Sequence, residues 1–450
     1  MSDCFEFYRQ RNPRTQEYIG NERFDTLPVH VAIDSRTVAL PSGQFALLAL
    51  ANQLARIHRR INFSLPSSPT PLRIPYPFSR PTVAETVLAM VNRIDPCGEF
   101  NIGIPSGPRV SIALGTDLPN HFDWYIGADR ALASLSSSPA EFSAVPGTLR
   151  GAALASCLGA AAVLRRMVGL DSTPRTVSCW NYAEGEYAAP GPDEIELLDV
   201  GRVLMVGAGA VAAALVHWLV VFGIRGEWTI VDKDLVELHN TNRALMFMPS
   251  DAGWPEGASR SKAELLASFI PGAKWAADWY HESELVEREY DVVLGLANGH
   301  DVRHHIASRS ATVTLHATTG RNWLCQLHRH ITGLDDCIWC RAGEVTEPIF
   351  GCSTADIPAP AGERTDAALP FLSGGSGLML ATALQRLQRG ELANDECNDW
   401  RWDFGSTHRM ASSGFRKCRD TCSRTLPAAV RHEINRANRW RTLDPGSQRS

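Results

Sequence analysis

Long apolar runs, each closed by a glycine-rich or polar turn, mark the second half of the chain. The clearest run lies at 203–234, VLMVGAGAVAAALVHWLVVFGIRGEWTIVDKD. It predicts a buried strand, a tight glycine turn, a helix and a second strand that ends in acid. Gly207 and Gly209 let the backbone approach a phosphate without Cβ clashes, and the free N–H groups of the following helix would face the anion. Asp232, 25 residues after Gly207, stands where a carboxylate can bind a ribose hydroxyl. The pattern therefore predicts an adenine-nucleotide site.

The same run admits two other interpretations. A glycine turn can be purely structural within a sheet, and the uncharged stretch 203–224 has the length of a membrane span. The glycine turn inside the stretch and the charged sequence after it favour a strand and helix buried in a parallel sheet, which are equally apolar. The third small position of the turn is Ala212, which the pattern tolerates.

The first 190 residues alternate between strand-like and helix-like runs. Strands are predicted at 29–34, 60–66, 109–115 and 123–129, and helices at 43–60, 82–94 and 151–169. This is a doubly wound α/β pattern without a glycine-rich phosphate turn, as a degenerate copy of the second half would show. Residues 180–199 indicate a connector, and 344–365 a loop. Further elements are a strand at 291–297, a helix at 300–310, a strand at 312–320 and a helix at 369–390. We therefore divide the chain into 1–190, 191–425 and a basic tail at 426–450.

Composition narrows the class of protein. The chain has 450 residues, 44% hydrophobic and 21% charged, as expected of a protein with two or three folded domains. Its net charge of −5 does not indicate the basic surface that nucleic-acid binding requires. The first twenty residues carry acids and no apolar core, so we expect no signal peptide, no membrane association and a cytoplasmic protein. In that compartment eleven cysteines favour metal binding or thiol chemistry over disulfides, with Cys97, Cys157 and Cys179 as inert core residues.

Cationic and amide side chains follow the acid at the end of the second strand. Asn240 and Arg243 lie eight and eleven residues beyond Asp232, and Lys262 lies on a later helix that would return toward the sheet edge. Cations near a nucleotide phosphate neutralise the charge that builds up in phosphoryl or adenylyl transfer. Hydride transfer has no such need. The alternative is a solvated basic face, the commoner fate of an isolated cation.

Three segments together resemble one family: VGAGAVAAAL, TIVDKDLVELHNTNR and SKAELLASFIPGA. From about 199 to 425 the chain resembles the adenylating domain of ubiquitin-activating enzymes and their bacterial relatives ThiF and MoeB. The resemblance implies an α/β fold, namely a Rossmann-like doubly wound adenylation domain with zinc-binding knuckles, preceded by a degenerate, inactive adenylation-like α/β domain. It also implies that Gly207 and Gly209 cradle phosphates, Asp232 holds ribose, and Asn240, Arg243 and Lys262 contact the phosphates of ATP.

The resemblance further implies an activity and partners. The family attaches AMP to the C-terminal glycine of a ubiquitin-like, β-grasp carrier protein, which in some members carries sulfur. It often then passes the carrier to a cysteine. A conjugating enzyme would be a second partner, and a homodimer is one assembly that the family allows.

The sequence departs from the family pattern at the magnesium position. The family has an Asp–Asn pair after the fourth strand, where this chain has Asn298 and Gly299. Asparagine is a poorer ligand for Mg²⁺ because it brings no charge, and Asp301, a little further along, is the substitute carboxylate. Residues 248–259 are extra and predict a surface insertion. A further cation usually comes from the partner half, and Arg9 is our candidate.

Two cysteine pairs have the spacing of a closed zinc site. Cys337 and Cys340 are followed about 80 residues later by Cys418 and Cys422. Four thiolates complete a tetrahedral zinc shell, and in the family such pairs hold a structural zinc away from ATP. Redox-active or merely buried thiols are the alternative. The nearby pair His328 and His330 is more typical of a hairpin face than of metal ligands.

Cys352 is the candidate nucleophile. It lies on a proline-flanked loop, where relatives of this family carry the cysteine that attacks the acyl adenylate, and a loop can bring a thiolate to the site. Cys325 is a weaker candidate because a strand-like segment holds it in place. Two competing functions stay open. One is an NAD-dependent oxidoreductase on the same fold. The other is a nucleotide-binding pseudoenzyme that acts as a scaffold, and Asn298 is the feature that supports it.

Overall fold

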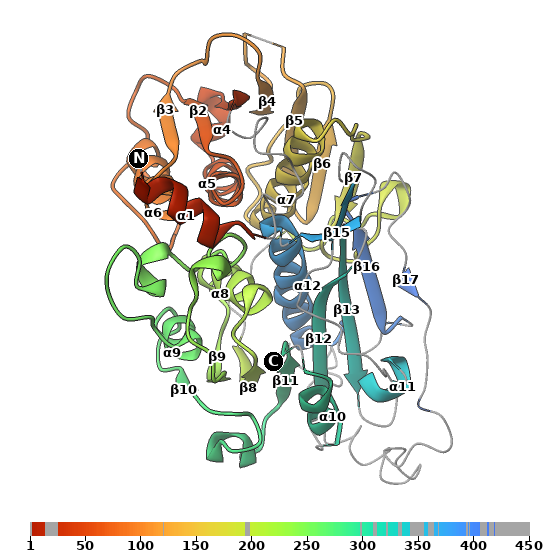
Figure 1. The fold of residues 1–450 in the computed structure, drawn as a ribbon. Helices are drawn as coiled ribbons and strands as arrows, with labels where there is room; N and C mark the ends of the chain where they lie inside the picture. Colours follow the sequence, from red (N-terminus) through yellow and green to blue (C-terminus); the bar gives the residue numbers. More distant parts are fainter. Residues whose placement is uncertain are drawn as a thin grey trace.

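The computed structural model describes residues 2–13, 26–119, 121–193, 199–297, 299–308, 313–320, 323–331, 335–342, 355–358, 364–367, 369–392, 395, 397–405, 412–413 and 418. Two large sheets, one from each half of the chain, form the frame of the molecule, and helices pack between them (Figure 1). The α/β class predicted from the sequence is confirmed, because parallel strands dominate both sheets.

The first sheet has seven strands in the order β3-β2-β1-β4-β5-β6-β7. The strands β3, β2, β1, β4 and β5 are parallel, and the last two run antiparallel. The four predicted strands are confirmed, whereas β3, β6 and β7 were not predicted. The bounds are β1 (Val29–Ile33), β2 (Arg60–Ser64), β3 (Glu99–Ile102), β4 (Val110–Leu114), β5 (Trp124–Asp129), β6 (Leu132–Ser136) and β7 (Arg175–Ser178).

The second sheet repeats this order with one added strand, as β10-β9-β8-β11-β12-β13-β16-β17. Its first five strands are again parallel and the others antiparallel. In both sheets the strand order reverses beside the first strand of the half, which is the arrangement of a doubly wound dinucleotide-type fold. The bounds are β8 (Asp199–Val206), β9 (Arg225–Val231), β10 (Lys274–Ala276), β11 (Val292–Gly295), β12 (Val313–Gly320), β13 (Leu324–Ile331), β16 (Asp399–Asp403) and β17 (Ser412–Ser413).

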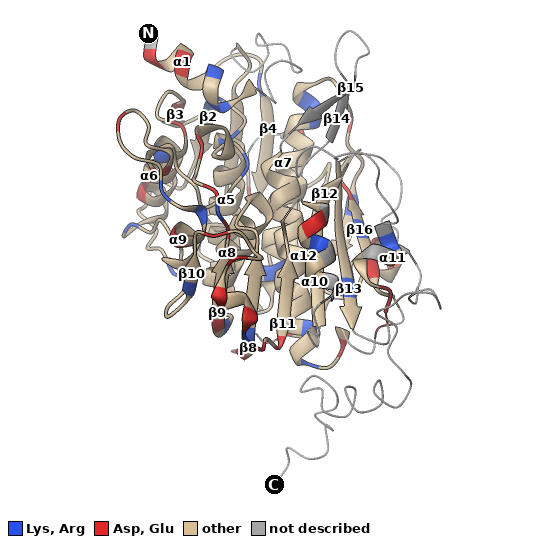
Figure 2. Ribbon diagram, turned by 60° about the horizontal axis from the view of Figure 1, so that its bottom comes forward, with Lys and Arg blue, Asp and Glu red and all other residues tan. Residues whose placement is uncertain are grey.

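Four apolar helices fill the space between the sheets: α5 (Pro41–Ala55), α7 (Thr148–Met167), α8 (Ala210–Phe222) and α12 (Pro370–Gln388). α7 packs on the first sheet and on α5, while α12 packs on the second sheet, on α8 and on α7. α5 and α8 carry no charged residue (Figure 2), as expected of helices that are buried on nearly every side. The apolar run at 203–224 is thus a strand and a helix inside the core. Among the described residues, no helix is both long and apolar enough to cross a membrane.

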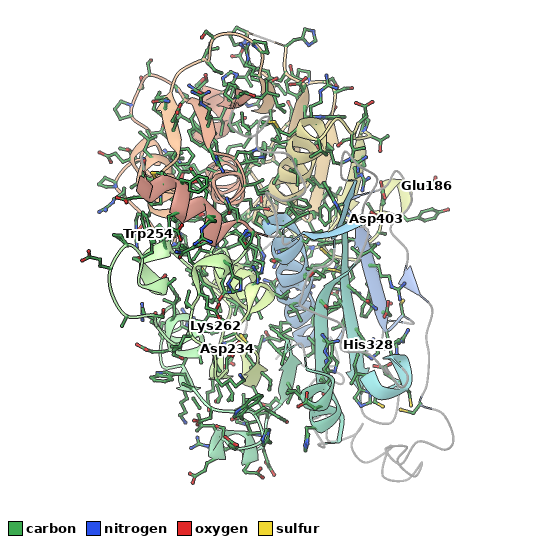
Figure 3. All side chains as sticks on the ribbon, viewed as in Figure 1. Glu186, Asp234, Trp254, Lys262, His328 and Asp403 are labelled. Carbon is green, nitrogen blue, oxygen red and sulfur yellow. A yellow bond between two sulfur atoms is a disulfide. The ribbon has the colours of Figure 1, made fainter. Side chains whose placement is uncertain are left out.

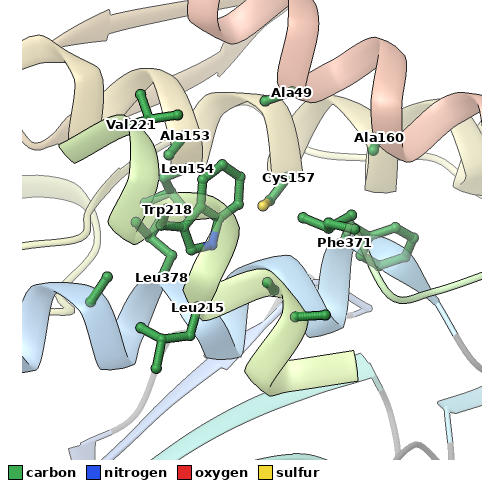
Figure 4. Packing of buried hydrophobic residues seen from close by; sticks show 14 of the residues in the cluster. Ala49, Ala153, Leu154, Cys157, Ala160, Leu215, Trp218, Val221, Phe371 and Leu378 are labelled. Atoms are coloured by element: carbon green, nitrogen blue, oxygen red, sulfur yellow. The ribbon is translucent and has the colours of Figure 1, made fainter. Parts of the chain in front are cut away.

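Close approach between these helices depends on small residues and one large indole. A Cβ added to Gly377 of α12 would lie 2.6 Å from the backbone nitrogen of Leu215 in α8, so the two helices meet at backbone contact. Trp218 of α8 fills the space beside them (Figure 4), and its Nε1 donates a 2.9 Å hydrogen bond to the carbonyl of Gly374. Buried residues of both halves therefore form one continuous core.

The remaining helices are shorter or amphipathic, and α6 (Val83–Ile94) and α9 (Lys262–Ala267) each add one apolar face to this core. α6 has the predicted amphipathic pattern and a capping box between Thr82 and Glu85.

Two segments differ from prediction: the loop at 344–365 contains part of a short hairpin, and the connector at 180–199 buries Trp180 and Tyr182. The other elements are α1 (Ser2–Arg11), α4 (Ser35–Val38), α10 (His300–Ser308), α11 (Ile338–Ala342), β14 (Ala355–Pro358), β15 (Arg364–Ala367), η1 (Gly185–Tyr187), η2 (Leu238–Asn240), η3 (Pro249–Ala252) and η4 (Glu284–Glu287).

One expectation about the cysteines is wrong. Cys97 is not an inert core thiol but forms a disulfide with Cys4, 93 residues away. The two meet because α1 packs beside the end of α6, where Arg11 forms a buried 2.8 Å ion pair with Asp95 and the Tyr8 hydroxyl donates to the same carboxylate. Cys157 and Cys179 are buried in the core, as expected.

Candidate functional site

A pocket of about 410 Å³ opens at the carboxyl ends of β8, β9 and β11. This is the edge of the second sheet where the strand order reverses, the usual place for a ligand in such folds. Six sequence-predicted residues line it: Gly207, Gly209, Asp232, Asn240, Arg243 and Lys262. Asn298 lies outside the described residues, but its neighbours Ala297 and Gly299 line the pocket, as does Asp301.

The glycine turn between β8 and α8 has the geometry that the sequence predicts. Gly207 has φ +95°, and a Cβ there would lie 2.6 Å from the backbone nitrogen of Ala297, so only glycine fits. Gly209 caps the N-terminus of the 13-residue helix α8, and a Cβ built on it meets nothing within 4 Å. Gly209 and Ala210 line the pocket, so the N-terminal end of α8 borders it, as an anion site requires.

Asp232 ends β9 with its carboxylate held by the backbone. One oxygen accepts a 2.5 Å hydrogen bond from the N–H of Ala208, and the other accepts a 2.8 Å bond from the N–H of Asp234. Burial raises the pKa of Asp232 above its usual value, while these two hydrogen bonds oppose the rise. Because each carboxylate oxygen keeps a further lone pair, the group can still accept a hydrogen bond from a hydroxyl group of a ligand.

Lys262 lies at the start of α9 and reaches back to the end of β9. Its Nζ lies 2.9 Å from Oδ2 of Asp234, and its backbone N–H donates to the Asp234 carbonyl (Figure 3). Burial alone would raise the pKa of Asp234, but the hydrogen bond and charge of Lys262, together with Lys233, bring it below its usual value. Asp234 was not singled out from the sequence; its signal was the Asp-x-Asp spacing with Asp232.

Asn240 and Arg243 come from η2 and the turns after it. The Asn240 side chain accepts a 3.0 Å hydrogen bond from the N–H of Glu237, which closes the turn. Arg243 donates from Nη1 to the carbonyl of His239 at 2.7 Å and to the side chain of Asn242 at 3.1 Å. The pocket lining thus includes three cations, Lys233, Arg243 and Lys262, which come from segments after β9 rather than from the predicted phosphate turn.

The far wall of the pocket was not predicted. Asp278, Trp279 and Tyr280 line it just after β10, and Lys233 Nζ lies 4.1 Å from the centre of the Trp279 ring. The only sequence signal was an acid followed by two aromatics, which does not by itself indicate a ligand.

Arg9 lies on α1 outside the pocket lining, and Trp254 of the insertion packs on the same helix. Arg9 forms a 2.6 Å ion pair with Glu6, and its side chain is 65% exposed. It is not among the residues that line the pocket. Within the insertion, residues 255–259 are exposed as predicted, whereas Trp254 packs against Phe7 of α1 with ring centroids 4.7 Å apart.

Three of the four predicted zinc ligands converge. The sulfurs of Cys337, Cys340 and Cys418 lie within 4.8 Å of one another, and Cys422 lies outside the described residues. Clustered thiolates suit a soft, tetrahedral ion such as Zn²⁺. His328 is engaged elsewhere, because its two ring nitrogens lie 3.0 Å from the carbonyls of Asn398 and Asp336.

The two candidate nucleophiles are placed differently. Cys352 lies outside the described residues. Cys325 is buried on β13, where its sulfur donates to the Leu372 carbonyl at 3.2 Å. Burial raises the pKa of Cys325 to about 12, so its thiol stays protonated near neutral pH.

Comparison with protein-family models matches residues 186–410 to the ThiF family. The NEDD8-activating enzyme E1 catalytic subunit of Caenorhabditis elegans is 35% identical over 81 residues, which are 18% of this chain and 17% of that protein. The SAMP-activating enzyme E1 of Haloferax volcanii is 37% identical over 82 residues, 18% of this chain and 28% of that protein. The matched regions thus span less than a third of either relative. The crystal structure of E. coli MccB with ATP covers 52% of this chain and 67% of its own, with 13% identity and a TM-score of 0.38.

Proposed function

The chain belongs to the ThiF family, and from this premise we propose that it is an ATP-dependent activating enzyme for a ubiquitin-like or sulfur-carrier protein. The observation that carries the proposal is the convergence of four features on one pocket: the Gly207 turn, the N-terminus of α8, the Asp232 carboxylate, and the cationic side chains of Arg243 and Lys262. An adenylating enzyme needs this set, whereas hydride transfer does not need the cations.

In this proposal different pocket residues bind different parts of the nucleotide. The N–H groups at the start of α8 bind phosphate oxygens, and Asp232 accepts a hydrogen bond from a ribose hydroxyl. The C-terminal carboxylate of the carrier attacks the α-phosphorus; a new O–P bond forms, the bond to the β-phosphate breaks, and pyrophosphate leaves. Arg243 and Lys262 stabilise the charge on the departing phosphates.

Mg²⁺ belongs to the same proposal. Asp301 lines the pocket and would hold the ion, together with Asn298, whose position the described residues do not include. When bound, Mg²⁺ supplies positive charge next to the phosphate oxygens. A carboxylate at the rim of a pocket with a phosphate-type turn is the hard oxygen donor that this ion requires.

We further propose that the carrier passes to Cys352. The thiolate would attack the carbonyl carbon of the acyl adenylate, a thioester would form, and AMP would leave. Support comes from the sequence position of Cys352 and from the burial of Cys325, which removes the competing candidate. A conjugating enzyme would then accept the carrier, and a homodimer is the proposed assembly if one forms. A zinc ion held by Cys337, Cys340, Cys418 and Cys422 would be structural, since its cysteines are separate from the pocket lining.

The first half is proposed as an inactive counterpart that binds no nucleotide. At the matching strand ends, β1 and β4, the carboxylate of Asp34 accepts hydrogen bonds from the N–H groups of Thr37, Thr116 and Asp117 at 2.6, 2.8 and 3.0 Å. The chain's own carboxylate therefore occupies the place that an anionic ligand would need. Calorimetric titration of the full chain with ATP should accordingly give one site per chain, and two sites would contradict this assignment.

The proposed activity is tested by exchange of labelled pyrophosphate into ATP, with each small β-grasp protein of the same organism supplied in turn. Carrier-dependent exchange is expected. Binding of ATP without exchange for any carrier would favour the pseudoenzyme scaffold. Asn298 supports that alternative, because it stands where the family has an aspartate. Tight binding and turnover of NADH in a fluorescence titration would instead favour the oxidoreductase.

A further inference from the structure

Arg56 reaches from the first half of the chain into the second. It follows α5 directly and is only 1% exposed. Its guanidinium donates to three carbonyl oxygens of one segment of the second half: Thr241, Leu245 at 2.8 Å and Phe247 at 3.0 Å. The remaining nitrogen, Nε, donates to the side chain of Asn52 at 2.8 Å. One side chain thus binds three points of a segment that lies about 190 residues away in sequence.

The segment 241–247 is a wall of the nucleotide pocket. Arg243, Ala244 and Phe247 line the pocket, and Asn240 precedes them. The segment is built of turns rather than helix or strand, so its carbonyls have no regular ladder to satisfy them. Arg56 supplies donors to those carbonyls from within the core.

Further contacts of the first half fix Arg56 and the same wall. Asn52 donates to the Leu245 carbonyl at 3.2 Å, beside the guanidinium. Arg11 of α1 donates to the carbonyl of Ala55, the residue before Arg56, at 3.0 Å and is itself paired with Asp95. No carboxylate of the described residues lies within 4 Å of the Arg56 guanidinium, so its charge is directed at carbonyl oxygens. Charge-assisted hydrogen bonds of this kind are stronger than neutral ones.

We propose that Arg56 is a positioning residue for the pocket: through the carbonyls of 241–247 it holds Arg243 where the phosphates bind. The first half would therefore be required for the chemistry of the second, although it binds no nucleotide itself. The expected loss of rate rests on the proposed function. The expected ordering of the segment 241–247 by Arg56 rests on the contacts alone.

The variants are Arg56→Leu, the conservative Arg56→Lys and the milder Asn52→Ala, which removes one carbonyl bond and the partner of Nε. Arg150→Leu is the matched control. Arg150 is also a buried arginine of the first half that crosses to the second, where its Nε donates to Gln385 of α12 at 2.5 Å, but it does not line the pocket.

Two measurements are made on the full chain: amide hydrogen exchange of peptides covering 238–248 without ligand, and pyrophosphate exchange with KM and kcat for ATP. Arg56→Leu should speed hydrogen exchange in these peptides by at least about tenfold. It should lower kcat by about 10- to 100-fold, with a smaller change in KM, because misplacement of a charged group costs this much in rate. Arg56→Lys should recover part of both, and Asn52→Ala should lie between. Arg150→Leu should lower the melting temperature yet leave both measurements near wild type.

The outcomes separate the two proposals. Unchanged hydrogen exchange at 238–248 in Arg56→Leu and Asn52→Ala, or a change no larger than in Arg150→Leu, would overturn the role of Arg56. If Arg56→Leu does not fold, Asn52→Ala and Arg56→Lys decide by the same criterion. A wild-type chain without pyrophosphate exchange would instead overturn the proposed function, and hydrogen exchange would still decide whether Arg56 holds the segment.

Discussion

The ammonium of Lys262 lies 2.9 Å from the carboxylate of Asp234, so this pocket cation already has an anionic partner. The Lys262 side chain is 11% exposed and that of Asp234 47%. A phosphate entering the pocket would compete with Asp234 for Lys262, while the carboxylate holds the lysine side chain in place when no ligand is bound. Lys262 and Asp234 thus form a pair whose strength depends on whether nucleotide is present.

Replacement of either cation should impair adenylation. Arg243→Ala or Lys262→Ala removes charge that stabilises the departing phosphates and should slow pyrophosphate exchange by about 100-fold or more. Arg260→Ala is the control, because Arg260 precedes α9, pairs with Asp251 and Glu264, and does not line the pocket. Exchange that survives in both pocket variants would remove these residues from the proposed site.

Zinc should be present at about one ion per chain, since four thiolates complete one tetrahedral shell. Cys337→Ser should lower the zinc content and the melting temperature without a selective loss of ATP binding, as measured by elemental analysis and calorimetry. Cys397→Ser is the control, because its sulfur is outside the three-cysteine cluster. A metal-free protein with an undiminished melting temperature would rule the structural zinc out.

A thioester should form on Cys352 after ATP, Mg²⁺ and carrier are mixed. On a non-reducing gel we expect a carrier-linked band that thiol reductant removes, that Cys352→Ala lacks and that Cys325→Ala retains, since the Cys325 thiol is buried. A band of full intensity in Cys352→Ala would refute the assignment. A wild-type protein that stops at the free adenylate would show that no thiol step follows.

Acid should destabilise the protein through His217. Burial, with a smaller contribution from the charge of Arg56, lowers the pKa of His217 from 6.5 to about 3. Below pH 6.5 the His217 imidazole is protonated in the unfolded chain but stays neutral in the folded chain. The free energy of unfolding that is present above pH 6.5 is therefore lost as the pH falls toward 3. Between pH 7 and pH 5 the loss should be about 2 kcal/mol.

Urea unfolding at the two pH values measures this loss. His217→Leu should reduce the pH dependence by that amount, because leucine does not titrate and the described neighbours of the ring are aromatic. His281→Leu is the control for a histidine-to-leucine change at a half-exposed position, since the His281 side chain is 49% exposed. Equal pH dependence in wild type and His217→Leu would mean that the buried imidazole does not control acid stability.

Local patterns in the sequence were sufficient for much of the fold and for the nucleotide-type turn. The apolar run before Gly207, the small-residue turn and the acid at Asp232 are set by residues close in the chain, and strand, helix and φ requirement all follow from them. The same holds for the apolar helices and for α6, whose spacing and capping box are local. The placement of Asn240, Arg243 and Lys262 in one pocket followed from the resemblance to a family, not from spacing alone.

Only the tertiary structure decided which distant residues meet. The ion pair of Lys262 with Asp234, the disulfide of Cys4 with Cys97 and the hydrogen bonds of Arg56 to 241–247 join residues 28, 93 and up to 191 positions apart. Such contacts leave no periodic signal, because they depend on how two sheets of the same strand order pack through α5, α7, α8 and α12. A hydrophobic pattern specifies which face of an element is buried, but the side chain that it meets there is fixed only when the whole core closes.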